Sequence, residues 1–135
     1  MRPAGGPLGR IGTERAMARI LLADQDDVLR GYLSRQLARM GHAVLPVTCP
    51  REAVGRLMPG AFDILIAQAD MDGVDGPEFA RRAAAAVPGL RIFFLDGFRV
   101  LPLKEGARTV LADDTLEPAF HLNRLAHVID NLLAA

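Results

Sequence analysis

Residues 62–67 read FDILIA, a short apolar run of the length expected for a strand that is buried on both faces of a parallel sheet. Two similar runs lie on either side of it in the chain, RILLA at residues 19–23 and RIFFL at residues 91–95. AVL at residues 43–45 is a plausible further strand. Amphipathic stretches separate these runs, and strands that alternate with helices favour a doubly wound α/β fold.

The stretches between the runs carry helical signals. The first has apolar residues at helical spacing, which form one stripe of a helix: Leu29, Leu33, Leu37 and Met40. A second helix is predicted over residues 50–58, and a third begins at the DGPE segment of residues 75–78. Regularly spaced leucines and other apolar residues over 122–133 predict a last helix.

The segment between Gly97 and Ala119 has the least regular pattern. Pro102 and Gly106 interrupt any fourth helix. The fifth strand is either Thr109–Ala112 or a segment nearer Leu116, and the pattern does not choose between them. The sequence therefore predicts a five-stranded parallel sheet in which the register of the last strand stays open.

Composition limits the function classes. The chain of 135 residues has the size of one domain, and half of its residues are hydrophobic, which predicts a packed core. Sixteen basic residues balance sixteen acidic ones, so the basic excess typical of nucleic-acid and membrane surfaces is missing. The single cysteine, Cys49, can form neither an internal disulfide nor a multi-cysteine zinc site, and we expect it to be buried or half-buried.

The beginning of the chain differs from the rest. Residues 1–16 are rich in glycine, proline and arginine and lack periodicity, which predicts a disordered leader before a single domain over 17–135. No apolar run has the length of a membrane span, and no signal-peptide pattern is visible. We therefore expect a cytoplasmic protein.

Polar residues follow three of the predicted strands. Asp24 and Gln25 come after the first, Gln68 after the third and Asp96 after the fourth. In open parallel sheets, ligands bind at the carboxyl ends of the strands, where the strand order reverses. We therefore expect these four side chains to border one site.

Three segments, RILLADQDDVLRGYL, FDILIAQADMDGVDGPEFARRA and RIFFLDGF, resemble the signature segments of response-regulator receiver domains, the CheY-like superfamily. FHLNRLAHVIDNLL resembles the last helix of that family, so the resemblance covers essentially the chain after residue 16. The nearest resemblance is to stand-alone receivers of the CpdR type, which regulate the ClpXP protease. It implies two-component signalling and a flavodoxin-like sheet in the order 2-1-3-4-5 with helices on both faces.

In that family an aspartate after the third strand accepts a phosphoryl group, two acids after the first strand hold Mg²⁺, and a Thr or Ser follows the fourth. This sequence departs from each of these features. The acceptor position is Gln68, and a carboxamide is not a nucleophile. The acid pair is Asp24-Gln25, so Asp24 alone remains as an acidic ligand and Mg²⁺ binding should be weak or absent. Asp96 places a negative charge where the family has a hydroxyl.

The family also has a lysine at the end of the fifth strand. The single lysine of this chain is Lys104, which precedes both candidate strands, and Asp113 or Glu117 stands at the expected position. The degenerate pocket of Gln68, Asp24, Gln25, Asp96 and Glu117 thus implies a non-enzymatic pseudo-receiver without a cofactor. Such a protein would act through contacts with a histidine kinase, a protease adaptor or another regulator.

Other functions stay open. Asp70, two residues after Gln68, is an alternative phosphoacceptor, which would make the protein a conventional phosphorelay receiver. Pairing through the last helix and the fifth strand would make it a structural homodimer. Asp24, Asp96 and Asp26 could instead form a cation cluster. The histidines share no ligand spacing, so we expect surface or boundary positions for His42, His121 and His127.

Overall fold

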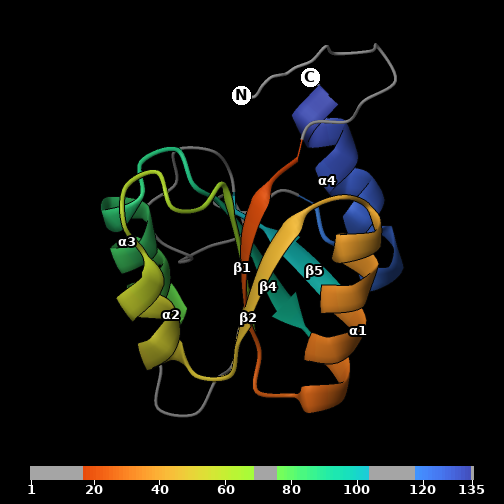
Figure 1. The fold of residues 1–135 in the computed structure, drawn as a ribbon. Coiled ribbons are helices and arrows are strands. Elements are labelled where there is room, and N and C mark those ends of the chain that lie inside the picture. Colours follow the sequence, from red (N-terminus) through yellow and green to blue (C-terminus); the bar gives the residue numbers. More distant parts are fainter. Residues whose placement is uncertain (1–16, 69–75, 104–117, 135) are drawn as a thin grey trace.

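The computed structural model describes residues 17–68, 76–103 and 118–134, which form one sheet with helices on both faces (Figure 1). The strands are β1 (Arg19–Ala23), β2 (Ala43–Val47), β3 (Ile64–Gln68), β4 (Arg91–Asp96), β5 (Arg99–Pro102) and β6 (Phe120–His121). The helices are α1 (Asp27–Arg39), α2 (Pro50–Arg56), α3 (Gly76–Ala86), the 3₁₀ turn η2 (Leu122–Arg124) and α4 (Leu125–Ala134). Within the described ranges, no helix is both long and apolar enough to span a membrane.

Four parallel strands make up one side of the sheet, with β2 at its edge. β1 pairs with β2 and with β3, and β3 pairs with β4, all in parallel, which gives the order 2-1-3-4. Side chains alternate between the faces: Leu21 and Leu65 share an apolar cluster with α2 and α3, whereas Ile20 and Ile66 share one with α1 and α4. Because helices cover both faces, β1, β3 and β4 are buried, continuous apolar runs, as predicted (Figure 1).

The edge of the sheet beyond β4 differs from the prediction. β5 pairs with β4 antiparallel, and β6 pairs with β5 antiparallel, so the expected all-parallel five-stranded sheet is wrong at this edge. The turn between Asp96 and Arg99 contains two residues, and Gly97 has φ 61° in it. Positive φ at the first turn residue suits a tight hairpin, and the chain reverses there without a crossover helix. Thr109–Ala112 and Leu116 lie outside the described residues.

Helix α1 follows its predicted pattern. Leu33 and Leu37 are buried, and Leu29 packs on the same cluster from a half-buried position. Asp26 caps the helix, because its Oδ1 accepts hydrogen bonds from the N–H groups of Val28 and Leu29 at 2.9 and 3.1 Å. The cap fixes where the helix begins, directly after the residues of the candidate site.

Two polar residues lie elsewhere than expected. His42 is buried rather than at the surface, because Ala18 N–H donates to its Nδ1 at 3.1 Å and its Nε2 lies 3.3 Å from Asp130 Oδ1. Cys49 is exposed rather than buried, because it is the N-cap of α2, where its Sγ accepts a hydrogen bond from Glu52 N–H at 3.4 Å. The polar partner decided the position in both cases.

Candidate functional site

The carboxyl edge of the sheet carries the predicted site residues. Gln68 is the last residue of β3 and pairs in register with Leu95 of β4. Asp24 and Gln25 directly follow β1, and Asp96 ends β4. Parallel pairing of these strands places their ends at one edge, as expected.

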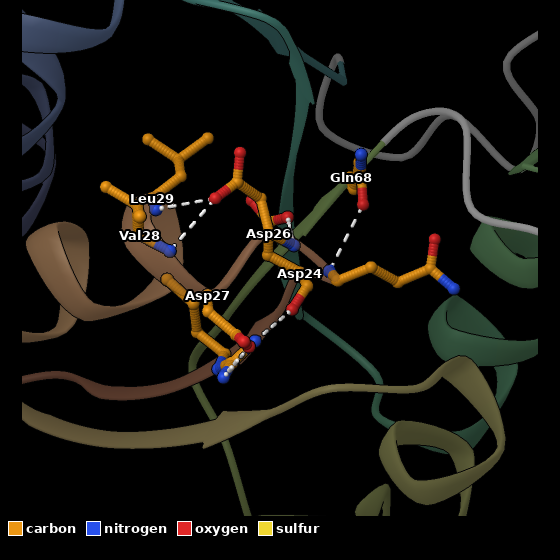
Figure 2. Close-up of polar contacts among 8 residues, drawn as sticks. Asp24, Asp26, Asp27, Val28, Leu29 and Gln68 are labelled. Atoms are coloured by element: carbon orange, nitrogen blue, oxygen red, sulfur yellow. Dashed lines mark hydrogen bonds and ion pairs between the residues drawn. The ribbon is translucent and has the colours of Figure 1, made fainter.

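The structure joins the residues after β1 to the end of β3. The side-chain Oε1 of Gln68 accepts a hydrogen bond from the backbone N–H of Gln25 at 3.2 Å (Figure 2). Gln68 is half-buried and Gln25 is exposed. The Gln68 carboxamide is therefore hydrogen-bonded to the turn that follows β1.

Asp24 is the buried acid of the site. Its side chain is fully buried, and its Oδ1 accepts a hydrogen bond from the backbone N–H of Asp26 at 2.9 Å (Figure 2). Its Oδ2 is buried and has no hydrogen-bond partner in the structure as described. Burial raises the pKa of Asp24 above its ordinary value and the Asp26 carboxylate adds to this, whereas the Asp26 N–H and the Arg30 charge act in the opposite direction.

Arg30 ties the start of α1 back to this turn. Its Nη1 donates to the backbone carbonyl of Asp24 at 2.9 Å, and its Nη2 lies 2.6 Å from Asp27 Oδ1. Neither the Arg30 contact nor the capping role of Asp26 was predicted from the sequence. The cap had a readable signal, an aspartate directly before a helical pattern. The Arg30 contact had none, because it depends on how the turn folds back.

Asp96 has no described contact with the turn after β1 that contains Asp24 and Asp26. Its side chain is 62% exposed, and its Oδ2 lies 3.6 Å from Arg99 Nη2 across the hairpin. Among the described hydrogen bonds and ion pairs, none joins Asp96 to Asp24 or Gln68. Two further predicted residues, Glu117 and the alternative acceptor Asp70, lie outside the described residues.

Among the described residues, this edge of the sheet offers few oxygen ligands of the kind that a divalent cation prefers. Hard cations prefer several clustered carboxylates, and Asp24 offers one buried carboxylate beside the carboxamide of Gln68. The Gln68 oxygen already accepts the Gln25 N–H. In the part of the chain that the structure describes, no three His, Cys, Asp or Glu side chains form a group that could hold a metal.

A hollow of about 300 Å³ lies at the opposite edge of the sheet, bordered by Arg19, Asp63 and Leu133 among others. Arg19 Nη2 lies 3.1 Å from Asp63 Oδ1 there. Burial acts to raise the pKa of Asp63, but the hydrogen bonds and charge of Arg19 together hold it below its ordinary value. This ion pair joins β1 to the start of β3 and is remote from the candidate site.

Comparison with known proteins agrees with this architecture. Residues 20–130 match the response regulator receiver domain. The response regulator receiver protein CpdR of Brucella abortus (strain 2308) is 34% identical over 119 residues, which cover 88% of this chain and 99% of CpdR.

Solved structures show the same fold. The receiver domain of the hybrid histidine kinase CckA has a TM-score of 0.65 and 26% identity, covering 85% of this chain and 98% of that domain. A chain from the complex of histidine kinase ThkA with the response regulator TrrA has a TM-score of 0.64 and 21% identity, covering 85% of this chain and 97% of that one. The chain described here therefore belongs to the family of response regulator receiver domains.

Proposed function

We propose that this chain is a pseudo-receiver, a single-domain response regulator that is not phosphorylated and acts through protein–protein contacts. The observation that carries the proposal is the position of Gln68 at the end of β3, with its carboxamide engaged by the Gln25 N–H. A carboxamide cannot supply the nucleophilic oxygen that forms an acyl phosphate. The site thus has the scaffold of a receiver without its reacting group.

The neighbouring acid supports the same proposal. Asp24 is fully buried and its pKa is raised, chiefly by burial, so it is a poorly accessible nucleophile and a weak cation ligand. A phosphoryl group in this pocket would gain little from a cation. The domain would therefore stay in one signalling state, and its output would depend on its abundance and on its partners.

The relatives suggest which partners to test. The resemblance to CpdR, at 34% identity over nearly its whole length, supports a role in regulated proteolysis through a protease adaptor. TrrA forms a complex with the histidine kinase ThkA, which supports a kinase as the second class of partner. Both proposals place the protein in the cytoplasm.

Phosphodonor labelling tests the proposal. The chain is incubated with acetyl phosphate and Mg²⁺, and in parallel with beryllofluoride and Mg²⁺, beside a receiver that retains its aspartate. Intact mass and the amide spectrum of this chain should not change, whereas the control should change in both. A stoichiometric gain of one phosphate would refute the pseudo-receiver, and peptide mapping would then show whether Asp70 carries it.

A further inference from the structure

The turn between β1 and α1 is held largely by side-chain acceptors. Asp24 Oδ1 accepts the N–H of Asp26, and Asp26 Oδ1 accepts the N–H groups of Val28 and Leu29 (Figure 2). These acceptors are local, since each lies within three residues of its donor. They fix the shape of the turn. Its first residue is also joined to β2, the strand on one side of β1, because the Asp24 N–H donates to the Val47 carbonyl at 3.2 Å.

Gln68 joins the turn to β3, the strand on the other side of β1. Its Oε1 accepts the Gln25 N–H across 43 residues of chain, from the last residue of β3. We propose that Gln68 is a positioning residue whose carboxamide serves as an internal ligand of the β1–α1 turn, holding that turn in one place without bound phosphate or cation.

The residue type matters to this role. A glutamine side chain has one more methylene group than an aspartate, and from the end of β3 that length brings Oε1 to 3.2 Å from the Gln25 nitrogen. An aspartate in the same place would carry its oxygens closer to its own backbone. The inference rests on the proposed function in one respect: it explains how a domain without phosphorylation keeps a single arrangement at this edge.

The consequence extends to α1. The held turn leads directly into the Asp26 cap, and Val28, in the first turn of α1, is 81% exposed. Arg30, one helical turn into α1, donates back to the Asp24 carbonyl. Loss of the Gln68 contact should therefore loosen the turn and the first turn of α1, while the strands in the core keep their packing.

Amide exchange measured by NMR on the full chain tests the inference. Gln68→Met keeps a similar side-chain length and removes the carboxamide oxygen. It should speed exchange of the Gln25 amide about fivefold, the factor expected for one ordinary hydrogen bond. Gln68→Glu keeps an acceptor oxygen at the same reach and should leave the rate within about twofold of the original.

The matched control is Gln36→Met on α1, which makes the same chemical change away from the turn. It should leave Gln25 exchange unchanged, and the amide of Leu65 in β3 should be unaffected in all variants. An unchanged Gln25 rate in Gln68→Met, or equal acceleration in Gln68→Glu, would overturn the inference. If a variant fails to fold, the unmodified protein decides the question. A nuclear Overhauser effect between the Gln25 amide proton and the Gln68 side chain supports the contact, and its absence refutes it.

Phosphodonor labelling tests the proposed function independently of the Gln68 contact. A chain that takes up phosphate yet shows the Gln68 contact would refute the pseudo-receiver and leave the internal ligand standing. A chain that takes up no phosphate and lacks the contact would refute the internal ligand alone.

Discussion

His42 Nε2 lies 3.3 Å from Asp130 Oδ1 and joins the turn before β2 to helix α4, across 88 residues of chain. The ring is buried, and its Nδ1 accepts the N–H of Ala18 at 3.1 Å. Since Nδ1 is an acceptor, the proton must reside on Nε2, which donates to the carboxylate. One side chain thus connects the start of β1, the start of β2 and the last helix.

His42→Phe removes both hydrogen bonds and leaves the Ala18 N–H and the Asp130 carboxylate without the ring. We expect a loss of about 1–3 kcal/mol in the free energy of unfolding, because the buried Ala18 N–H would lose its acceptor and a buried donor without an acceptor is costly. Chemical denaturation followed by circular dichroism measures it. His127→Phe, at an exposed position of α4, is the control and should change stability little. Equal denaturation midpoints for the two variants would contradict the prediction.

Asp24→Asn should stabilise the protein at neutral pH by about 1 kcal/mol. The substitution removes a buried ionised group whose Oδ2 has no described partner. The asparagine oxygen can still accept the Asp26 N–H. The pKa of Asp24 is raised in the folded state, so the unfolded chain ionises first as pH rises from the ordinary value of 3.8. Asp24 therefore does not destabilise the folded protein below that pH. Its destabilising effect grows as the pH rises, until the carboxyl group is ionised in the folded protein too.

Thermal denaturation of both proteins over a pH series checks this. The rise in thermal midpoint caused by Asp24→Asn should be near zero at about pH 3. It should reach a plateau of roughly 3–5 °C once the pH exceeds the pKa of Asp24 in the folded state. Asp27→Asn, at an acid that is 84% exposed, is the control for a charge change on the same turn. A gain that is as large in acid as at neutral pH would show that the buried charge is not its cause.

Mg²⁺ should have little effect on thermal stability. A ligand that binds only the folded state stabilises it by mass action, and a dissociation constant above about 10 mM gives less than ~0.4 kcal/mol at 10 mM Mg²⁺. The midpoint should therefore rise by no more than about 2 °C. NaCl at equal ionic strength corrects for screening. A larger rise that disappears in Asp24→Asn would demonstrate a specific site and favour the acidic-cluster alternative.

The single substitution Gln68→Asp should not restore a phosphorylation switch. The new carboxylate would lie next to the buried Asp24, and like charges at close range disfavour ionisation. In the family's arrangement the phosphoryl group would also meet Asp96 in place of a hydroxyl and would lack the lysine. Each such charge-assisted contact contributes roughly 1.5–3 kcal/mol.

The test compares Gln68→Asp with a combined variant that adds Gln25→Asp, Asp96→Thr and a lysine at Asp113 or Glu117, where the family's lysine is expected. We expect stable phosphate incorporation from acetyl phosphate, measured by intact mass, only in the combined variant. If Gln68→Asp alone accepts phosphate and changes its affinity for a partner, the other substitutions matter less than proposed here.

The sequence by itself determined the parallel strands of this fold and which residues lie at their carboxyl ends. Continuous apolar runs predicted strands that are buried on both faces. In the structure, four strands pair in the parallel order 2-1-3-4. Since parallel strands end at one edge, the spacing alone placed Gln68 and Asp24 at that edge. Whether a strand is buried depends on the apolar residues that follow one another in the chain, and these can be read directly from the sequence.

Tertiary structure alone decided which partners the polar groups found. β5 is antiparallel because the chain turns back in a tight hairpin, in which Gly97 has φ 61°, and no crossover is made. In the sequence, the Gly97-Phe98 pair between two apolar runs is only a weak signal for this hairpin. His42 is buried because Ala18 and Asp130 come to it from distant parts of the chain. The Gln68–Gln25 bond likewise spans two strands. Hydrogen bonds of this kind depend on side-chain direction and on ångström-scale distances, and residue spacing along the chain encodes neither.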